Sequence, residues 1–178
     1  MGFAYSGADA WTLATTIVIA ITKEHLLKNN VPTPISKVFT TAERDGWDRY
    51  PALVKPAAEH CSYGITPEAI VDDPDQLEAR VQYVLDTWHQ PALVEDFIDG
   101  IEVNVSLWGN GRLSVLPLAI IDFNAFSDYH DRIVSYDAKW DPDSEAFRLN
   151  PVVCPAEIEP ELKARIEKVA KDAYKALR

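Results

Sequence analysis

Lys55 is the first residue whose position suggests chemistry. It ends a short apolar run and stands directly before Pro56 and a loop of small residues. A lysine in that position can set its charge against a phosphate while backbone N–H groups of the loop close over it. On the residue alone, a solvated lysine at a strand end is the commoner role.

Two glutamates flank a turn in the segment ALVEDFIDGIEVNV. A purine edge presents both donors and acceptors, and the end of a strand offers matching groups alternately. Glu95 could accept from an adenine amino group, backbone groups of Phe97 and Ile98 could pair with the ring, and Glu102 could accept from ribose hydroxyls. Two ordinary solvent-facing acids are the alternative.

The remaining candidates lie in irregular stretches. Lys139, in SYDAKW, is either a second phosphate contact or a solvated lysine. His60, Cys61 and Ser62 are adjacent, so a Cys/His nucleophile can be imagined, although neighbouring side chains rarely face each other as that chemistry requires. There is no Cys-x-x-Cys and no Cys/His cluster at zinc spacing, and no metal ligand is assigned.

The composition narrows the class of protein. The 178 residues are 47% hydrophobic, which indicates a folded globular chain, and the formal net charge of -11 argues against nucleic acid or an anionic membrane as partner. The most apolar run, 13–21, is too short to span a bilayer. No basic segment precedes it, and the two cysteines are far apart, so a reducing cytoplasm is expected.

Local signals predict the elements of the first half. The pattern predicts one mostly helical segment over 8–30, which ends before Pro32, and a strand over 35–41. A short strand at 52–54 precedes the loop 57–64. Asp73 is expected to cap a helix whose first residue is Pro74 and whose apolar face carries Leu77, Val81, Val84 and Leu85.

The second half reads as strands followed by a helix. Segments 92–98, 101–108 and 113–123 predict a meander of three antiparallel strands, with turns at 99–100 and 109–111. Pro117 predicts an edge or a bulge in the third strand. Residues 124–156 are expected to be irregular, and an amphipathic helix is expected over 160–177.

The order of these segments resembles the central region of D-alanine–D-alanine ligases, which belong to the ATP-grasp superfamily. The segments that carry the resemblance are YPALVKPAAEHCSYGI, PALVEDFIDGIEVNV, SYDAKW and CPAEI. The earlier YSGADAWTLA and TKEHLLKNNVPTP also resemble the part of the family that precedes the ATP-grasp domain. The resemblance covers nearly all 178 residues.

The resemblance implies a role for each candidate. Lys55 and Lys139 would contact the ATP phosphates, Glu95, Phe97 and Ile98 the adenine, and Glu102 the ribose. The lid over the phosphates would be the loop that contains Glu59, His60, Cys61, Ser62 and Gly64. ATP phosphorylates a carboxylate in this family, with Mg²⁺, and an amine then attacks the acyl phosphate; the Mg²⁺ ligands are expected outside this chain.

The implied fold is α+β and ATP-grasp-like, with two α+β lobes that sandwich a nucleotide. We expect a helical lead-in over 1–30, a first lobe over 31–97 with the lid loop 57–64, and a second lobe over 98–178. We expect the second lobe to be incomplete and to end in the amphipathic helix.

Two positions depart from the family pattern. The family usually has an Asp-Lys pair a few residues before Thr22-Lys23, and that lysine touches ATP; here the pair is Val18-Ile19. The lid usually reads Gly-Ser-Ser where this chain has 60–62, and the bulkier His60 should restrict the backbone relative to glycine.

Two functions therefore remain open. One is the ATP-binding part of a carboxylate–amine ligase of peptidoglycan biosynthesis that acts on a small amino acid. The other is a non-catalytic or degenerate module that binds ATP or ADP. Either could act as a homo-oligomer or need a partner chain to complete the site.

Overall fold

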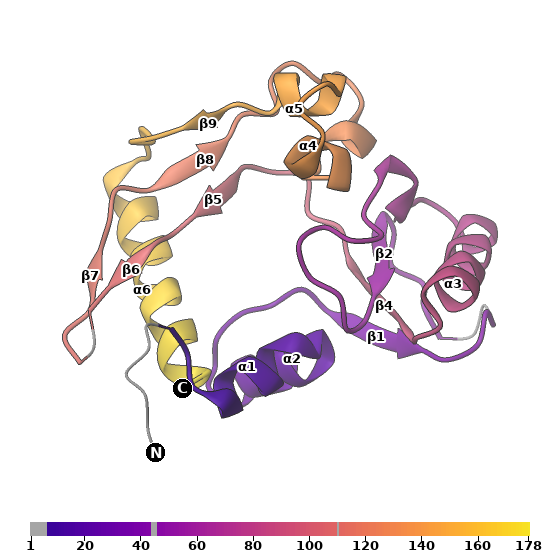
Figure 1. The fold of residues 1–178 in the computed structure, drawn as a ribbon, viewed down its shortest axis with the longest axis horizontal. Coiled ribbons are helices and arrows are strands. Elements are labelled where there is room, and N and C mark those ends of the chain that lie inside the picture. The colour runs from indigo at the N-terminus through magenta and orange to yellow at the C-terminus, as the bar shows by residue number, and fades with distance from the viewer. Residues whose placement is uncertain (1–6, 44–45, 110) are drawn as a thin grey trace.

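The structure is a computed structural model that describes residues 7–43, 46–109 and 111–178. Two larger antiparallel sheets and a separate two-stranded sheet organise the described part of the chain (Figure 1). The first contains β1 (Ser36–Phe39), β2 (Ala52–Pro56), β3 (Ile70–Val71) and β4 (Ala92–Asp96), in the order β1-β4-β2-β3. The 3₁₀ turn η1 (Pro67–Ala69) leads into β3.

Helix α3 (Pro74–Trp88) packs on the first sheet and forms the main core with it. Asp73 caps the helix by accepting from the Gln76 amide at 2.8 Å, and Pro74 is its first residue, as the sequence predicted. The core joins the helix face to alternate residues of the central strands: Leu77, Val81, Val84, Val54 and Val94. The side chains of Leu53 and Lys55 lie on the opposite, half-buried face of β2.

The segment predicted to be mostly helical over 8–30 is confirmed, and it forms two helices, α1 (Ala10–Ile17) and α2 (Ile19–Lys28), separated by a break at Val18 that the sequence did not predict. Val18 has extended torsion angles, φ −91° and ψ 103°. The run around it is β-branched, which weakens its preference for a helix. The Ile19 amide donates to the Ala57 carbonyl at 3.0 Å instead of continuing the helix, so a contact with the base of the lid loop decides the break.

The second sheet contains β5 (Glu102–Asn104), β8 (Ala119–Ile121) and β9 (Val152–Val153), in the order β5-β8-β9. Strands β6 (Leu107–Trp108) and β7 (Ser114–Val115) form a separate hairpin. Helix α6 (Pro160–Ala176) begins at Pro160, as expected, and contacts α2. The predicted turn at 109–111 includes Asn110, which lies outside the described residues.

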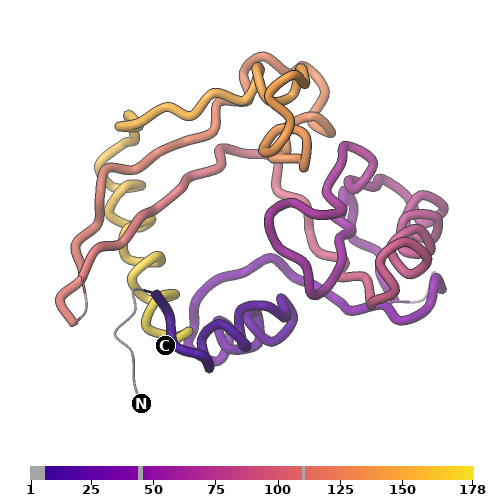
Figure 2. Tube along the Cα trace, viewed as in Figure 1, coloured from indigo at the N-terminus to yellow at the C-terminus, as the bar shows by residue number. Residues whose placement is uncertain are grey.

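The predicted three-stranded meander is wrong for its first strand, whereas the predicted antiparallel pairing of segments 101–108 and 113–123 is confirmed. β4 pairs with β1 and β2, and β5 pairs with β8, so residues 97–101 carry the chain from one sheet to the other (Figure 2). Pro117 lies in neither strand, because β7 ends at Val115 and β8 begins at Ala119. Proline lacks the amide that a ladder needs, which accounts for the interruption.

The segment 124–156, predicted to be irregular, contains short elements. These are the 3₁₀ turn η2 (Tyr129–Asp131), α4 (Tyr136–Trp140), α5 (Glu145–Leu149) and β9. Ser135 caps α4 by accepting from Ala138, and Ser144 caps α5 by accepting from Phe147. None of the helices described combines the length and apolar composition needed to cross a bilayer.

Candidate functional site

A buried carboxylate between two lysines forms the centre of the candidate site. Glu95 lies on β4, and its Oε2 is 2.7 Å from Nζ of Lys23, while its Oε1 accepts from Nζ of Lys55. The Lys23 ammonium also donates to Oγ1 of Thr33 at 2.8 Å. Lys23 is 6% exposed and Glu95 7%, so helix α2 and strands β2 and β4 are tied together inside the protein.

Strand register explains why Lys55 and Glu95 meet. Glu95 stands opposite Leu53 across the β2–β4 ladder, and Lys55 follows Leu53 by two residues, so it lies on the same face. Diagonal cross-strand neighbours are within reach of long side chains. The sequence predicted both residues for a ligand site, and the structure places their side chains in contact.

The two lysines keep Glu95 ionised. Burial alone would raise the pKa of Glu95, but the ammonium groups of Lys55 and Lys23 outweigh burial and hold the pKa below its ordinary value. The site therefore offers a fixed carboxylate acceptor beside two cations, a combination suited to a ligand that has both an amino group and phosphates.

The connection after β4 is held from the first sheet. Arg49 binds Asp96 through two hydrogen bonds of 2.6 and 2.7 Å, and the Phe97 amide donates to the Pro51 carbonyl at 3.0 Å. A cavity of about 500 Å³ opens beside these residues and is also lined by Ile98, which is 68% exposed. The Phe97 N–H is thus already used, which leaves the Phe97 carbonyl and the Ile98 backbone for a ligand.

Glu102 and Lys139 lie apart from the buried cluster. Glu102 begins β5 and Lys139 lies on α4, and both side chains are exposed. Although Glu102 keeps a large exposed surface, desolvation of its carboxyl group raises the pKa of Glu102, and the positive charge of Lys139 opposes that rise. The described part of the chain shows no hydrogen bond between them, so the two residues interact only through their charges.

The lid loop is anchored at its base. Gln90 donates to a carboxylate oxygen of Glu59 at 2.9 Å and accepts from the Ala58 amide at 2.7 Å. Gly64 has φ +73°, and an added Cβ would lie 2.8 Å from the Pro56 ring, so a side chain is excluded there. The left-handed conformations at the lid tip fall on Cys61 and Ser62, with φ 58° and 63°, rather than on His60.

Helix α4 holds the tip of the lid. Nε1 of Trp140 donates to the Cys61 carbonyl at 2.8 Å, and the Tyr136 amide donates to the Ile65 carbonyl at 3.0 Å. The rings of Tyr63 and Tyr136 are 5.1 Å apart. Because Lys139 belongs to the same helix, the lid and the second candidate phosphate lysine are held together.

We expect Trp140→Phe to loosen the lid tip. Loss of one hydrogen bond worth about 0.5–1.5 kcal/mol should raise the rate at which a disulfide reagent modifies Cys61 by about 2- to 10-fold. Cys154 is also exposed and lies outside the lid, so its rate serves as the control within the same molecule. An unchanged rate at Cys61 would show that Trp140 does not restrain the loop.

A titratable cluster lies beside the connection between the sheets. Nε2 of His130 is 2.9 Å from Oδ2 of Asp72 and Nδ1 is 2.7 Å from Oδ1 of Asp128, while the Tyr129 hydroxyl donates to Asp72. Hydrogen bonding to Asp72 is the largest cause that raises the pKa of Tyr129 to about 12. The Tyr129 ring is 6.1 Å from the ring of Phe97, so the cluster abuts the candidate ligand residues.

We expect His130 to make stability depend on pH. The hydrogen bond that His130 donates to the Asp128 carboxylate is the main cause that raises the pKa of His130 above its ordinary 6.5. The protonated form therefore stabilises the fold below about pH 6.5, and this contribution is lost as pH rises through the folded pKa. Its size should be no more than about 1 kcal/mol, since the site is partly solvated.

Urea unfolding at pH 5.5 and 8.5 tests this expectation. His130→Gln should remove the part of the unfolding free energy that declines over this interval, and Asp128→Asn should reduce it. If both variants keep the wild-type pH dependence, another group is responsible.

Two site residues escaped the sequence analysis. Lys23 lies in a segment quoted only for its resemblance, and nothing local distinguishes a buried lysine on an amphipathic helix from an exposed one. Trp140 follows Lys139 directly, but its partner is 79 residues away. Among the described residues, no group of three or more His, Cys, Asp or Glu side chains is placed to hold a metal ion.

Comparison with known proteins shows the family of this chain. Residues 15–178 match the family described as D-ala D-ala ligase C-terminus. An uncharacterised protein of Sinorhizobium fredii is 30% identical over 98% of this chain and 49% of its own length. The D-alanine–D-alanine ligase of Carboxydothermus hydrogenoformans is 29% identical over 99% of this chain and 55% of its own length.

Solved structures give the same fold. The D-alanine–D-alanine ligase from Bacillus anthracis complexed with ATP has a TM-score of 0.69 at 24% identity, over 97% of this chain and 50% of that one. The VanG D-Ala:D-Ser ligase from Enterococcus faecalis has a TM-score of 0.70 at 24% identity, over 95% and 47%. The chain spans about half the length of the curated relatives it matches. It belongs to the D-alanine–D-alanine ligase C-terminal family and has its α+β ATP-grasp fold.

Proposed function

We propose that this chain is the ATP-binding region of a carboxylate–amine ligase. The observation that carries the proposal is the buried Glu95 carboxylate held between Lys55 and Lys23. Glu95 would accept from the adenine amino group, with Phe97 and Ile98 along the ring edge and Glu102 at the ribose. Lys55 would leave Glu95 for the phosphates, where Lys139 would be the second cation and the lid of residues 57–64 would close.

In this reaction, an oxygen of a substrate carboxylate bonds to the γ-phosphorus of ATP, and the bond to ADP breaks. An amine nitrogen then bonds to the acyl carbon, loses a proton and expels phosphate. The two lysines would offset the negative charge that develops on the transferred group. The names of the relatives make D-alanine the first amino acid to test as substrate.

Calorimetric titration of the chain with ATP, and separately with GTP, tests the proposal. ATP should bind saturably and at least about tenfold more tightly than GTP, because guanine presents a carbonyl where adenine presents its amino group and would face the Glu95 carboxylate unpaired. Equal affinities, or no saturable binding at millimolar ATP by a folded sample, would contradict it. Phosphate release with ATP and D-alanine would then separate a ligase from a module that only binds nucleotide.

A non-catalytic nucleotide-binding module is favoured by one observation. Ile19 stands where the family has a lysine that touches ATP. Since the Ile19 amide lies 3.0 Å from the Ala57 carbonyl, this position adjoins the base of the lid.

We expect Ile19→Lys to restore a phosphate contact and to raise ATP affinity about 3- to 10-fold, with a smaller gain for AMP. Calorimetry with both nucleotides measures the effect. Ile21→Lys, at an exposed position of the same helix, adds the same charge and is the matched control. An equal gain in both variants would indicate a general charge effect rather than a contact.

A further inference from the structure

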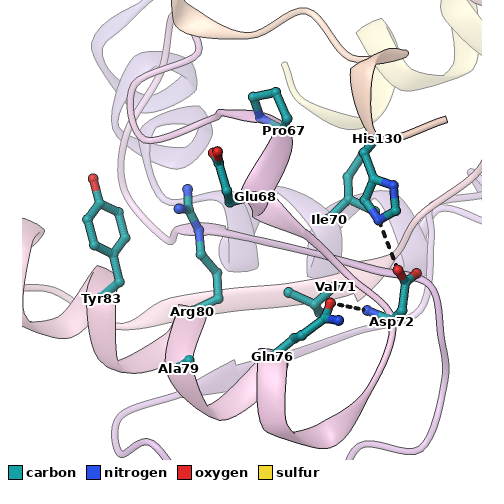
Figure 3. Close-up of a pocket in the computed structure, with 10 residues that line it drawn as sticks. All are labelled: Pro67, Glu68, Ile70, Val71, Asp72, Gln76, Ala79, Arg80, Tyr83 and His130. Carbon is teal, nitrogen blue, oxygen red and sulfur yellow. Dashed lines mark hydrogen bonds and ion pairs between the residues drawn. The ribbon is translucent and has the colours of Figure 1, made fainter. Parts of the chain in front are cut away.

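The larger of the two cavities near the first sheet is distinct from the proposed nucleotide site, although Asp72 and His130 at one end of it belong to the cluster beside Phe97. Its volume is about 620 Å³, and none of the residues proposed to contact ATP lines it. Figure 3 shows side chains from α3 along one wall, from η1 and β3 along another, and His130 from η2 at one end. The cavity is therefore a feature separate from the Lys23–Glu95–Lys55 cluster.

Most of the cavity surface is apolar. Ile70 and Val71, both 2% exposed, form part of its wall together with Ala79. The ring of Tyr83 stands at the end opposite His130 (Figure 3). A hydrocarbon or aromatic body placed there would remove its own apolar area from water together with that of the more exposed Ala79 and Tyr83, which favours binding.

Arg80 provides a cation that forms no ion pair with a carboxylate in the described part of the chain, although the charge of Glu68 acts on it. Its Nη2 donates to the Gly64 carbonyl at 2.8 Å, its guanidinium lies 4.5 Å from the centre of the Tyr83 ring, and its Nε is buried without a hydrogen-bond partner in the described part of the chain. Desolvation lowers the pKa of Arg80. A partly desolvated guanidinium in a cavity wall is best matched by a carboxylate.

Two other arginines, unlike Arg80, form ion pairs with aspartates within the described residues. Arg49 binds Asp96 and Arg132 binds Asp99, each with an Asp oxygen within 3.0 Å of a guanidinium nitrogen. No such pair is found for Arg80 among residues 7–43, 46–109 and 111–178. The position of Arg80 in the cavity wall is what separates it from these surface pairs.

Two acidic side chains, Asp72 and Glu68, also line the cavity, and their negative charges would favour a cationic ligand over a carboxylate. Asp72 accepts from the Tyr129 hydroxyl and contacts His130, so its charge is already offset. Glu68 has an exposed side chain, where solvent screens its charge. The partly buried Arg80 should therefore decide which charge the cavity prefers, and a test must compare both signs.

We propose that this cavity binds a small carboxylic acid with an apolar body. The carboxylate pairs with the Arg80 guanidinium, and the body lies on Ile70, Val71 and Ala79. This binding needs neither ATP nor any residue of the proposed nucleotide site, so it can hold or fail independently of the proposed function.

The test compares two probes with the same body and opposite charge, 4-phenylbutyrate and 4-phenylbutylamine, titrated into the chain and followed by calorimetry. 4-Phenylbutyrate should bind saturably and at least about tenfold more tightly than the amine. Tighter or equal binding of the amine would overturn the proposal, because it would show that Glu68 and Asp72 decide the preference. No saturable binding of either probe at about 10 mM would overturn it as well.

Variants locate the site. Arg80→Gln should weaken 4-phenylbutyrate binding at least about tenfold, whereas Arg165→Gln, on exposed α6, should leave it unchanged. Because Arg80 also bonds to Gly64, a second variant fills the cavity without touching that bond: Ala79→Trp, at an exposed helix position, should abolish binding while circular dichroism stays that of the wild type. Retained affinity in Ala79→Trp would place the ligand elsewhere and refute the assignment.

Discussion

Replacing Glu95 with glutamine is expected to lower the free energy of unfolding by about 3–5 kcal/mol. The side chains of Lys23 and Glu95 are only 7% and 10% exposed, so the lysine depends on this carboxylate for its compensation. In the variant, the Lys23 ammonium keeps its hydrogen bond to Thr33. It then faces a neutral amide in place of the carboxylate, and the like charge of the Lys55 ammonium lies nearby. Removing one partner of a buried pair costs more than the pair itself contributes.

Urea unfolding with a double variant measures how much of this loss is due to the stranded charge. Lys23→Met combined with Glu95→Gln should be more stable than Glu95→Gln alone, because the uncompensated ammonium is gone while the aliphatic body remains. Glu102→Gln, at an exposed position, is the control and should change stability by less than about 0.5 kcal/mol. A double variant as unstable as the single one would mean that packing, and not charge, explains the loss.

The same residue should give the wild type part of its acid sensitivity. The two lysines depress the pKa of Glu95 below its ordinary 4.5 in the folded state. Its stabilising contribution is therefore complete above about pH 4.5 and is lost as pH falls through the depressed folded value. Stability measured from pH 6 down to pH 3 should fall less steeply in Glu95→Gln than in the wild type.

Local sequence signals correctly predicted those helix starts that depend only on residues within the first turn. Asp73 and Pro74 define the start of α3 because capping and the fixed φ of proline act within one turn. Pro160 opens α6 for the same reason. The serine caps of α4 and α5 carried the same kind of signal, at Ser135 and Ser144, and could have been found in the region expected to be irregular.

Local sequence signals could not predict the contacts between segments that are distant in the chain. Strand 92–96 could pair with its neighbour in sequence or with β1 and β2, and burial of Ala92, Leu93 and Val94 on both faces favours the central position it takes. The break at Val18 depends on the hydrogen bond from the next residue, Ile19, to the carbonyl of Ala57, which lies 39 residues after Val18 in the chain. The alternation of strand residues does place Lys55 and Glu95 on one face once the pairing is known, but Lys23 arrives from a helix whose packing no pattern specifies.

Lys55→Met is expected to separate the phosphate-binding role of this lysine from its ion pair with Glu95. If Lys55 moves to the phosphates when nucleotide binds, the variant should lose about 10- to 100-fold in affinity for ATP. Adenosine has no phosphate to lose, and its amino group would meet a Glu95 carboxylate that still pairs with Lys23 but is no longer shared with Lys55. Adenosine affinity should therefore stay the same or rise.

Calorimetry with ATP and adenosine on the wild type, Lys55→Met and Lys139→Met measures this difference. Lys139 is exposed and lies outside the buried cluster, so its removal should weaken ATP binding less than the removal of Lys55 and should leave stability unchanged. Equal losses for ATP and adenosine in Lys55→Met would mean that the lysine acts by orienting Glu95. Since Lys23 alone would then hold the carboxylate too loosely for adenine, the phosphates would have to be bound by residues other than Lys55.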